Sequence, residues 1–128
     1  MITVKVPIYI NINKKKVTLM GLNHYRNAHF RVLDKCKKEY LSLVDLDIEG
    51  EPILEGTIHA HFEIYLKRKG TDGGNVRAVI EKFVLDAIKS LGYIKDDHAG
   101  IIVSDSSEYH FDKEFPRAVI TLTKKDGL

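Results

Sequence analysis

The chain has 128 residues, of which 44% are hydrophobic and 30% are charged, and its formal net charge is +2. This length suits a single domain spanning residues 1–128, and the hydrophobic share is large enough for a core, which excludes a disordered chain. A charge balance so close to zero excludes a uniformly cationic surface, so partners have to be inferred from local patterns.

The sequence contains one cysteine, Cys36, so no disulfide can form within the chain, which fits a reducing compartment. The first ten residues alternate instead of forming the apolar run of a secretion signal. No segment approaches the roughly 18 to 20 apolar residues that a membrane span needs. We therefore expect a soluble, cytoplasmic protein.

Basic residues gather locally despite the small net charge. Such clusters are able to contact phosphate groups, although solvated loops and helix faces produce them as well. The three clusters are Lys14, Lys15 and Lys16, then Lys35, Lys37 and Lys38, and then Lys67, Arg68 and Lys69.

The N-terminal segment alternates with period two from Ile2 to Ile10, which predicts a strand with one buried face. Because Pro7 cannot donate to a ladder, we expect this strand to lie at a sheet edge or to be locally irregular. Residues 14–23 predict a second short strand, joined to the first by a hairpin.

A helical spacing of apolar residues follows and predicts a helix from about Arg26 to Val44. Residues 47–56 contain two glycines and a proline and predict a loop. Residues 57–67 then alternate cleanly between apolar and polar, and they predict the most regular strand of the chain.

The polar face of that strand carries His59 and His61, which point the same way because they are two residues apart. Two such histidines are able to chelate a transition metal. Phosphate contact and a plain polar sheet face are the alternatives.

The stretch from Asn75 to Leu91 places apolar residues at i, i+3, i+4, i+7 and onward, which predicts an amphipathic helix. Asn75 is a good N-cap, and Gly92 is a good residue to end the helix in the left-handed conformation. Residues 100–106 and 116–122 predict two more strands, joined by a polar connection. This order of elements predicts an α+β domain, with a small mixed sheet and two main helices packed on it.

Five carboxylates stand out in and around this helix. A helix of about 17 residues is roughly 25 Å long, so acids before and after it meet only if the chain folds back after Gly92. A strand running back along the helix would place Asp97 beside Lys82 and Asp86. The five acids are Asp72, Glu81, Asp86, Asp96 and Asp97.

Acids that gather in one place suit a hard cation, because Mg²⁺ prefers oxygen ligands, and such a site would serve phosphoryl transfer. Alternatively, the adjacent acids cap a turn and the helical acids pair with lysines, for example Lys82 with Asp86. The turn "GTDGGN" lacks the lysine and hydroxyl of a Walker loop, and no G-x-S-x-G elbow occurs, which argues against nucleotide hydrolysis and acyl transfer by those routes.

The stretch "DGGNVRAVIEKFVLDAIKSLGYIKDD" resembles the core motif of the RusA-like crossover junction endodeoxyribonucleases, which are mostly encoded by phages or prophages. That family reads Asp-x-Asp-Asn, then a lysine, then Asp-x-Leu, then Gly and Asp-Asp. Upstream, "LNHYRNAHF" is similar to the family's Asn-x-Tyr-Arg segment, and downstream "FPRAVITL" resembles its closing strand. The matching positions are Asp72, Asn75, Lys82, Asp86, Gly92, Asp96 and Asp97, with Asn23, Tyr25 and Arg26 upstream.

The resemblance implies a small α+β nuclease domain that forms a homodimer and binds four-way (Holliday) DNA junctions. Such enzymes nick two strands symmetrically with Mg²⁺, for which Mn²⁺ is a possible substitute. Phage recombination and replication in the host cytoplasm would be its setting. The resemblance implies that Asp72 and Asp97 are metal ligands and that Lys82 contacts the scissile phosphate. Glu81, Asp86 and Asp96 are further candidate ligands.

Branched DNA is recognised by shape, so no base-reading motif is required, and affinity for its backbone falls steeply with salt. We expect basic and amide side chains along the motif and in the clusters to hold that backbone. These are Lys14, Lys15, Lys16, Asn23, Arg26, Lys67, Arg68, Lys69, Asn75 and Arg77.

The chain departs from the family pattern at two points. The second acid of Asp-x-Asp-Asn is Gly74 here, and the spacing from Asn75 to Asp86 is longer by about one helical turn. A full turn keeps the faces in phase, so Lys82 still faces the same way as Asp86. A branch of the family with this longer spacing continues with an acid-Lys-Phe segment, which "EKF" matches, so that Glu81 would replace the missing acid.

The sequence is compatible with two other classes of function. One is a non-catalytic DNA-binding recombination accessory protein on the same fold, with Gly74 marking the loss of the metal site. The other is a structural or interaction protein whose acids only cap and pair. In a homodimer, the acids of a site could come from either chain.

Overall fold

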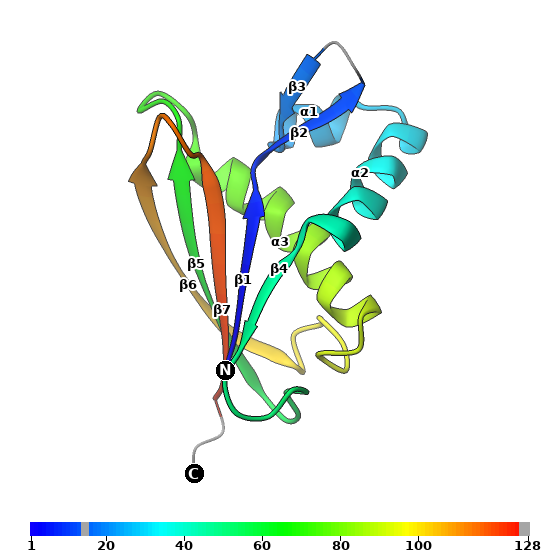
Figure 1. The fold of residues 1–128 in the computed structure, drawn as a ribbon, viewed down its shortest axis with the longest axis vertical. Helices are drawn as coiled ribbons and strands as arrows, with labels where there is room; N and C mark the ends of the chain where they lie inside the picture. Colours follow the sequence, from blue (N-terminus) through cyan, green and yellow to red (C-terminus); the bar gives the residue numbers. More distant parts are fainter. Residues whose placement is uncertain (14–15, 126–128) are drawn as a thin grey trace.

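The computed structural model describes residues 1–13 and 16–125, and its centre is a five-stranded mixed sheet (Figure 1). The sheet order is β4-β1-β7-β5-β6, and every neighbouring pair is antiparallel except β5 with β6. The short strands β2 and β3 form a separate hairpin. The strands are β1 (Ile2–Pro7), β2 (Tyr9–Asn13), β3 (Lys16–Leu19), β4 (Asp45–Ile48), β5 (Ile58–Leu66), β6 (Ile102–Phe111) and β7 (Arg117–Lys124).

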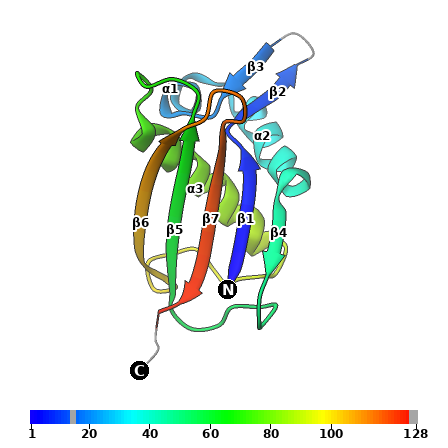
Figure 2. The ribbon, with the colours of Figure 1, turned by 60° about the vertical axis from the view of Figure 1, so that its left-hand side comes forward.

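The helices lie on one face of this sheet, and the other face is not covered by any helix of the described residues (Figure 2). Helix α3 (Gly73–Ser90) connects the parallel strands β5 and β6, and helix α2 (Phe30–Leu43) packs beside it. The short helix α1 (Leu22–Asn27) precedes α2. The predicted α+β class, with a mixed sheet and two main helices on it, is confirmed at this level.

The core forms where α3 meets the alternating strand β5. Every second residue of β5, from Ile58 to Leu66, is buried, and the residues between them are only partly buried. Each large apolar side chain buried in this way stabilises the fold by about 1.5–3 kcal/mol. Helix α3 buries all of its predicted apolar stripe except Leu91, namely Val76, Val79, Ile80, Phe83, Val84, Ala87 and Ile88.

Helix α3 ends as its sequence predicts. Gly92 has φ of 86°, and the Tyr93 N–H donates to the Ile88 carbonyl at 3.1 Å. This is the Schellman arrangement, which satisfies carbonyls at the end of a helix and favours glycine because a side chain is strained at positive φ. No helix of the described residues is long and apolar enough to cross a membrane.

The N-terminal strand differs from its prediction. It is interrupted at Ile8, so that β1 joins the main sheet while β2 leaves it for the hairpin. Strand β1 lies between β4 and β7, so the predicted edge position is wrong, whereas the predicted irregularity is present. Strand β4 pairs only with Ile2 to Lys5, and Pro7 therefore lies beyond the end of that ladder, where its missing N–H costs no bond to β4.

The predicted single helix from Arg26 to Val44 is also wrong, because two helices replace it. Ala28 and His29 are extended, and the His29 imidazole accepts from the Arg31 N–H at 3.2 Å as the N-cap of α2. The predicted loop over residues 47–56 starts later than expected, because Asp45 to Ile48 form β4.

The chain after α3 does not run back as a strand along the helix. Ile94 makes an isolated bridge with Leu54, and the next strand, β6, begins only at Ile102 and pairs in parallel with β5. Strand β6 continues to Phe111, so much of the expected polar connection is strand. The strand was predicted too short because β6 lies at the sheet edge and its middle residues, 104–107, are all polar, so no apolar alternation marks them as strand.

Tyr40 links helix α2 to the point where β1 ends. Its hydroxyl donates to the Pro7 carbonyl at 3.0 Å, its ring stacks on Phe83 of α3, and its side chain is fully buried. Burial raises the pKa of this hydroxyl, so it remains a donor at every ordinary pH.

We predict that Tyr40→Phe lowers the free energy of unfolding by about 1 kcal/mol, because the half-buried Pro7 loses the donor to its carbonyl while the ring contacts remain. Urea denaturation followed by circular dichroism measures the change. An unchanged unfolding midpoint would contradict this role of the hydroxyl.

Candidate functional site

Three residues of the family-like motif meet in one recess on the helix side of the molecule. Lys82 and Asp86 come from α3, and Asp97 comes from the loop that follows it. The recess has a volume of about 210 Å³, and Tyr25 of α1, Lys37 of α2 and Phe83 of α3 complete its wall. The position of Asp97 beside Lys82 and Asp86 agrees with the sequence-based expectation, although the chain reaches it through a loop and not a strand.

The charged groups of the recess pair differently from the predicted i, i+4 bridge. Asp86 pairs with Lys37 at 3.3 Å, which joins α3 to α2. The Lys82 ammonium lies 5.7 Å from the centre of the Tyr25 ring instead. A cation over an aromatic face is held by the ring quadrupole, so Lys82 is positioned without a carboxylate partner of its own in the described chain.

The two adjacent acids have unequal roles. Asp96 accepts the Asp97 backbone N–H at 2.8 Å and pairs with Lys89 at 3.2 Å, and these contacts lower the pKa of its carboxyl. Asp97 lies 4.0 Å from Lys89 and lines the recess. Asp96 therefore caps the turn, as the alternative interpretation expects, and Asp97 is the acid of the pair that faces the recess.

Glu81 lies beside the recess and not in its wall. Burial raises the pKa of Glu81; the Arg77 charge opposes this rise, and the charges of Asp105 and Asp97 add to it. Arg77 contacts Glu81 at 3.6 Å and Asp105 at 3.0 Å. Glu81 is thus close enough to Asp97 for their charges to interact, while its carboxylate is turned toward Arg77.

Arg77, which was expected to contact DNA, is half-buried between α3 and the sheet. Its guanidinium lies 4.5 Å from the centre of the Phe62 ring, and its side chain is only 20% exposed. Its guanidinium forms ion pairs with the two acids beside it, Asp105 on β6 and Glu81 on α3.

Asp72 lies at the opposite end of α3 from the recess. It is the N-cap of the helix and accepts the Asn75 N–H at 3.2 Å, so the prediction of Asn75 as the N-cap is wrong. The rise of an α-helix separates Asp72 from Glu81 by about 13 Å and from Asp86 by about 21 Å along the axis. Asp72 and Asp97 of one chain therefore do not share a metal ion in this conformation.

The start of α3 is fixed by close packing against β6. A Cβ added at Gly73 would lie 2.3 Å from the Tyr109 ring, so a side chain there would force that ring to move. Gly74, where the family pattern has its second acid, has space: an added Cβ would lie 3.4 Å from Asp72 Oδ1. The missing acid would therefore have stood beside Asp72, far from the recess.

The expected DNA-contacting residues are spread over several surfaces. Lys14 and Lys15 lie outside the described residues, and Lys16 begins β3. Lys67, Arg68 and Lys69 form an exposed turn between β5 and α3, and Lys67 lies 5.9 Å from the ring centre of Tyr9 on β2. Asn23 and Arg26 are exposed on α1, and Asn75 is exposed in the first turn of α3.

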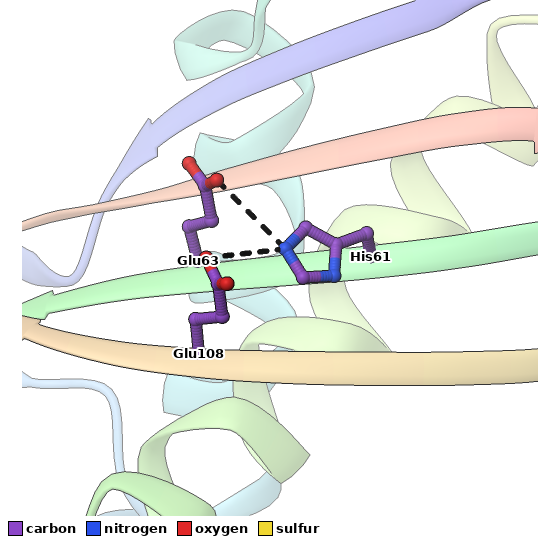
Figure 3. A group of neighbouring side chains, drawn as sticks. All are labelled: His61, Glu63 and Glu108. Carbon is purple, nitrogen blue, oxygen red and sulfur yellow. Dashed lines mark ion pairs between the residues drawn. The ribbon is translucent and has the colours of Figure 1, made fainter.

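A second polar cluster occupies the open face of the sheet, where no helix covers it. His61 and Glu63 project from β5, and Glu108 projects from β6 (Figure 3). Within the described residues this is the one group whose three possible ligand atoms lie within 4.8 Å of one another. Sequence reasoning identified His61 but missed Glu108, because Glu108 falls in the segment that was expected to be a connection.

Comparison with known proteins assigns no family to the chain. No model of a known protein family matches it, and a search of curated proteins finds no match.

We predict that Asp72 stabilises α3 through its oxygen and not through its charge. Asp72→Ala should lower the free energy of unfolding by about 1 kcal/mol, whereas Asp72→Asn should change it by no more than a few tenths, because Asn caps as well as Asp. Urea denaturation of the two variants checks this. Equal losses in both would show that the charge matters.

We predict that Glu81 weakens the fold as the pH rises. Its pKa is raised in the folded chain from an ordinary value of 4.5, so the folded state binds this proton more tightly than the unfolded state. The stability that the folded chain gains from binding this proton is therefore greatest below pH 4.5 and is lost as the pH rises through the raised pKa. The stability of Glu81→Gln relative to the native chain should consequently increase from pH 4 to 7, as measured by denaturation at each pH. A constant difference would contradict the raised pKa.

Proposed function

We propose that the protein is a magnesium-dependent, structure-selective endonuclease of the RusA-like type. It would hydrolyse phosphodiester bonds in four-way or branched DNA during phage recombination or replication. The supporting observation is that Lys82, Asp86 and Asp97, which are three positions of the resembling motif, share one solvent-open recess.

The side chains around the recess suit Mg²⁺ in their chemistry. Mg²⁺ usually takes one or two carboxylates and completes its shell with water and substrate phosphate. Asp97 and Asp86 provide two carboxylates in one recess, and Glu81 is close to Asp97. When bound, the ion would neutralise charge on the phosphate and activate water. Asp72 does not fit this donor set.

The basic residues of the recess would bind the scissile phosphate. Lys82 is exposed and held over Tyr25, so its ammonium is free to meet a phosphate oxygen. Lys37 stands on the opposite helix, paired with Asp86, and is available to a phosphate if that carboxylate turns to a metal. Preorganised cations of this kind stabilise the charge that develops in phosphoryl transfer.

The rest of the DNA would be held by backbone contacts. The exposed turn from Lys67 to Lys69 and the neighbouring hairpin lie at one end of the molecule, which offers positive charge beyond the recess (Figure 1). We further propose that two copies form a homodimer, because symmetric nicks across a junction need two sites.

A second candidate is a non-catalytic junction-binding protein on the same fold. The observation that favours it is the separation of Asp72 from the recess, together with the absence of an acid at Gly74. Such a protein would bind branched DNA in preference to duplex and would leave it uncut.

We predict that the protein cleaves a fluorescent synthetic four-way junction in Mg²⁺. Asp97→Asn should lower the rate by on the order of 10²-fold or more, since it removes charge from the centre of the reaction, while junction binding without metal is retained. Asp47→Asn, at an exposed site on the edge strand β4 and outside the recess, is the matched control and should cleave normally.

Three outcomes separate the alternatives. Cleavage that survives both Asp97→Asn and Asp86→Asn would show that the recess is not the active site. Junction binding without cleavage would favour the non-catalytic protein. Cleavage that is abolished by Asp72→Asn, a variant expected to keep the helix cap, would show that Asp72 joins the site in a dimer or another conformation.

A further inference from the structure

We propose that His61, Glu63 and Glu108 form a binding site for a divalent transition-metal ion, of which Zn²⁺ is the representative. The site lies on the open face of the sheet, whereas the recess lies on the helix side, so this inference does not rest on the proposed nuclease function. A mixed set of one imidazole and two carboxylates suits Zn²⁺ and its neighbours better than Mg²⁺, which prefers oxygen donors alone.

The three ligand atoms are already close to the spacing that such an ion requires. His61 Nε2 lies 3.8 Å from Glu63 Oε1 and 3.5 Å from Glu108 Oε2 (Figure 3). Ligands at 2.0–2.2 Å from a tetrahedral ion are about 3.4 Å apart. The two distances from His61 would have to shorten by only a few tenths of an ångström. The ligand oxygens of Glu63 and Glu108 lie within 4.8 Å of each other.

The sheet itself creates this spacing. Glu63 and Glu108 are register partners in the parallel pair of β5 and β6, and His61 precedes Glu63 by two residues on the same face. Two carboxylates directly opposite each other repel, which destabilises a strand pair unless a cation compensates them. A divalent ion would supply that compensation.

Each proposed ligand has a neighbour that would orient it. His61 Nδ1 lies 2.6 Å from the Ser106 hydroxyl, the Tyr65 hydroxyl donates to Glu63 at 3.4 Å, and His110 Nε2 lies 3.6 Å from Glu108 Oε2. Partners of this kind fix the tautomer and direction of ligands in established metal sites.

A chain of hydrogen bonds can hold His61 in the tautomer that binds a metal. If the His61 Nδ1–H donates to Ser106, that hydroxyl is free to donate to His59 Nε2 at 3.0 Å. The His59 Nδ1–H then donates to the Ser104 hydroxyl at 2.6 Å. In this arrangement the Ser106 hydroxyl and both ring nitrogens of His59 have partners, and the lone pair of His61 Nε2 is left facing the two glutamates.

The site is open enough to take an ion and a water. The side chains of His61, Glu63 and Glu108 are 28%, 32% and 54% exposed. Three protein ligands with an accessible fourth position is the arrangement of zinc sites that keep a water or a small ligand.

Titration of the full-length, tag-free chain with ZnCl₂ in a calorimeter tests the proposal. We expect one ion per chain, with affinity reduced at least tenfold by His61→Gln and by Glu108→Gln, and by about tenfold by Ser106→Ala. His98→Gln is the matched control, because His98 is also an exposed histidine near an acid, Asp96 at 3.9 Å, and it should bind normally. Mg²⁺ in excess should not displace the Zn²⁺.

A second measurement keeps the test decisive if a variant does not fold. NMR of the native chain should show the His61 ring resonances shifting on Zn²⁺ addition, with its Nδ1 protonated. No saturable binding of one Zn²⁺ would overturn the site, as would a His61→Gln or Glu108→Gln variant that folds by circular dichroism and binds as the native chain does. Junction cleavage that fails while Zn²⁺ binds would refute the nuclease function alone.

Discussion

Strand β5 buries every second side chain beneath α3 and turns the residues between them to the opposite face of the sheet. Because the described helices cover only one face, this alternation divides the molecule into two surfaces. The helix side carries the recess around Lys82 and Asp97, and the open side carries the cluster around His61. A slip of β5 by one residue would exchange its two faces and would disrupt both the core and the open-face cluster. The burial of Phe62 and its neighbours therefore determines which side chains lie on the open face as well as which form the core.

The elements with strong amphipathic patterns could be predicted from the sequence, and those that depend on tertiary neighbours could not. Helix α3 and strand β5 could be predicted from periodicity alone, because a buried face requires an apolar residue at each repeat of the helix or the strand. The break between α1 and α2 depends on the His29 imidazole acting as a cap, and histidine is not among the residues that usually signal a helix start. The inner position of β1 depends on β4, a strand of only four residues, which is too short to give a clear periodic pattern.

The candidate sites show the same division. The meeting of Asp97 with Lys82 and Asp86 could be anticipated, because the chain must turn back after Gly92 and the geometry of the helix limits how far it returns. The isolation of Asp72 follows from the same helix length, although the motif groups it with Asp97. The cluster of Glu63 with Glu108 could not be anticipated, because it depends on the register of two parallel strands joined through a whole helix.

The two clusters differ in the groups that lie next to their carboxylates, and this difference determines which ion each cluster favours. On the helix side, lysines stand next to the acids, as Lys37 does beside Asp86, so the recess can exchange an internal ion pair for a metal and a phosphate. On the open face, the groups beside Glu63 and Glu108 are the imidazoles of His61 and His110. Oxygen donors beside fixed cations favour a hard ion that arrives with an anionic substrate. Oxygen donors beside an imidazole nitrogen favour a transition-metal ion that binds by itself. The same fold can therefore present two sites whose donor sets favour different ions.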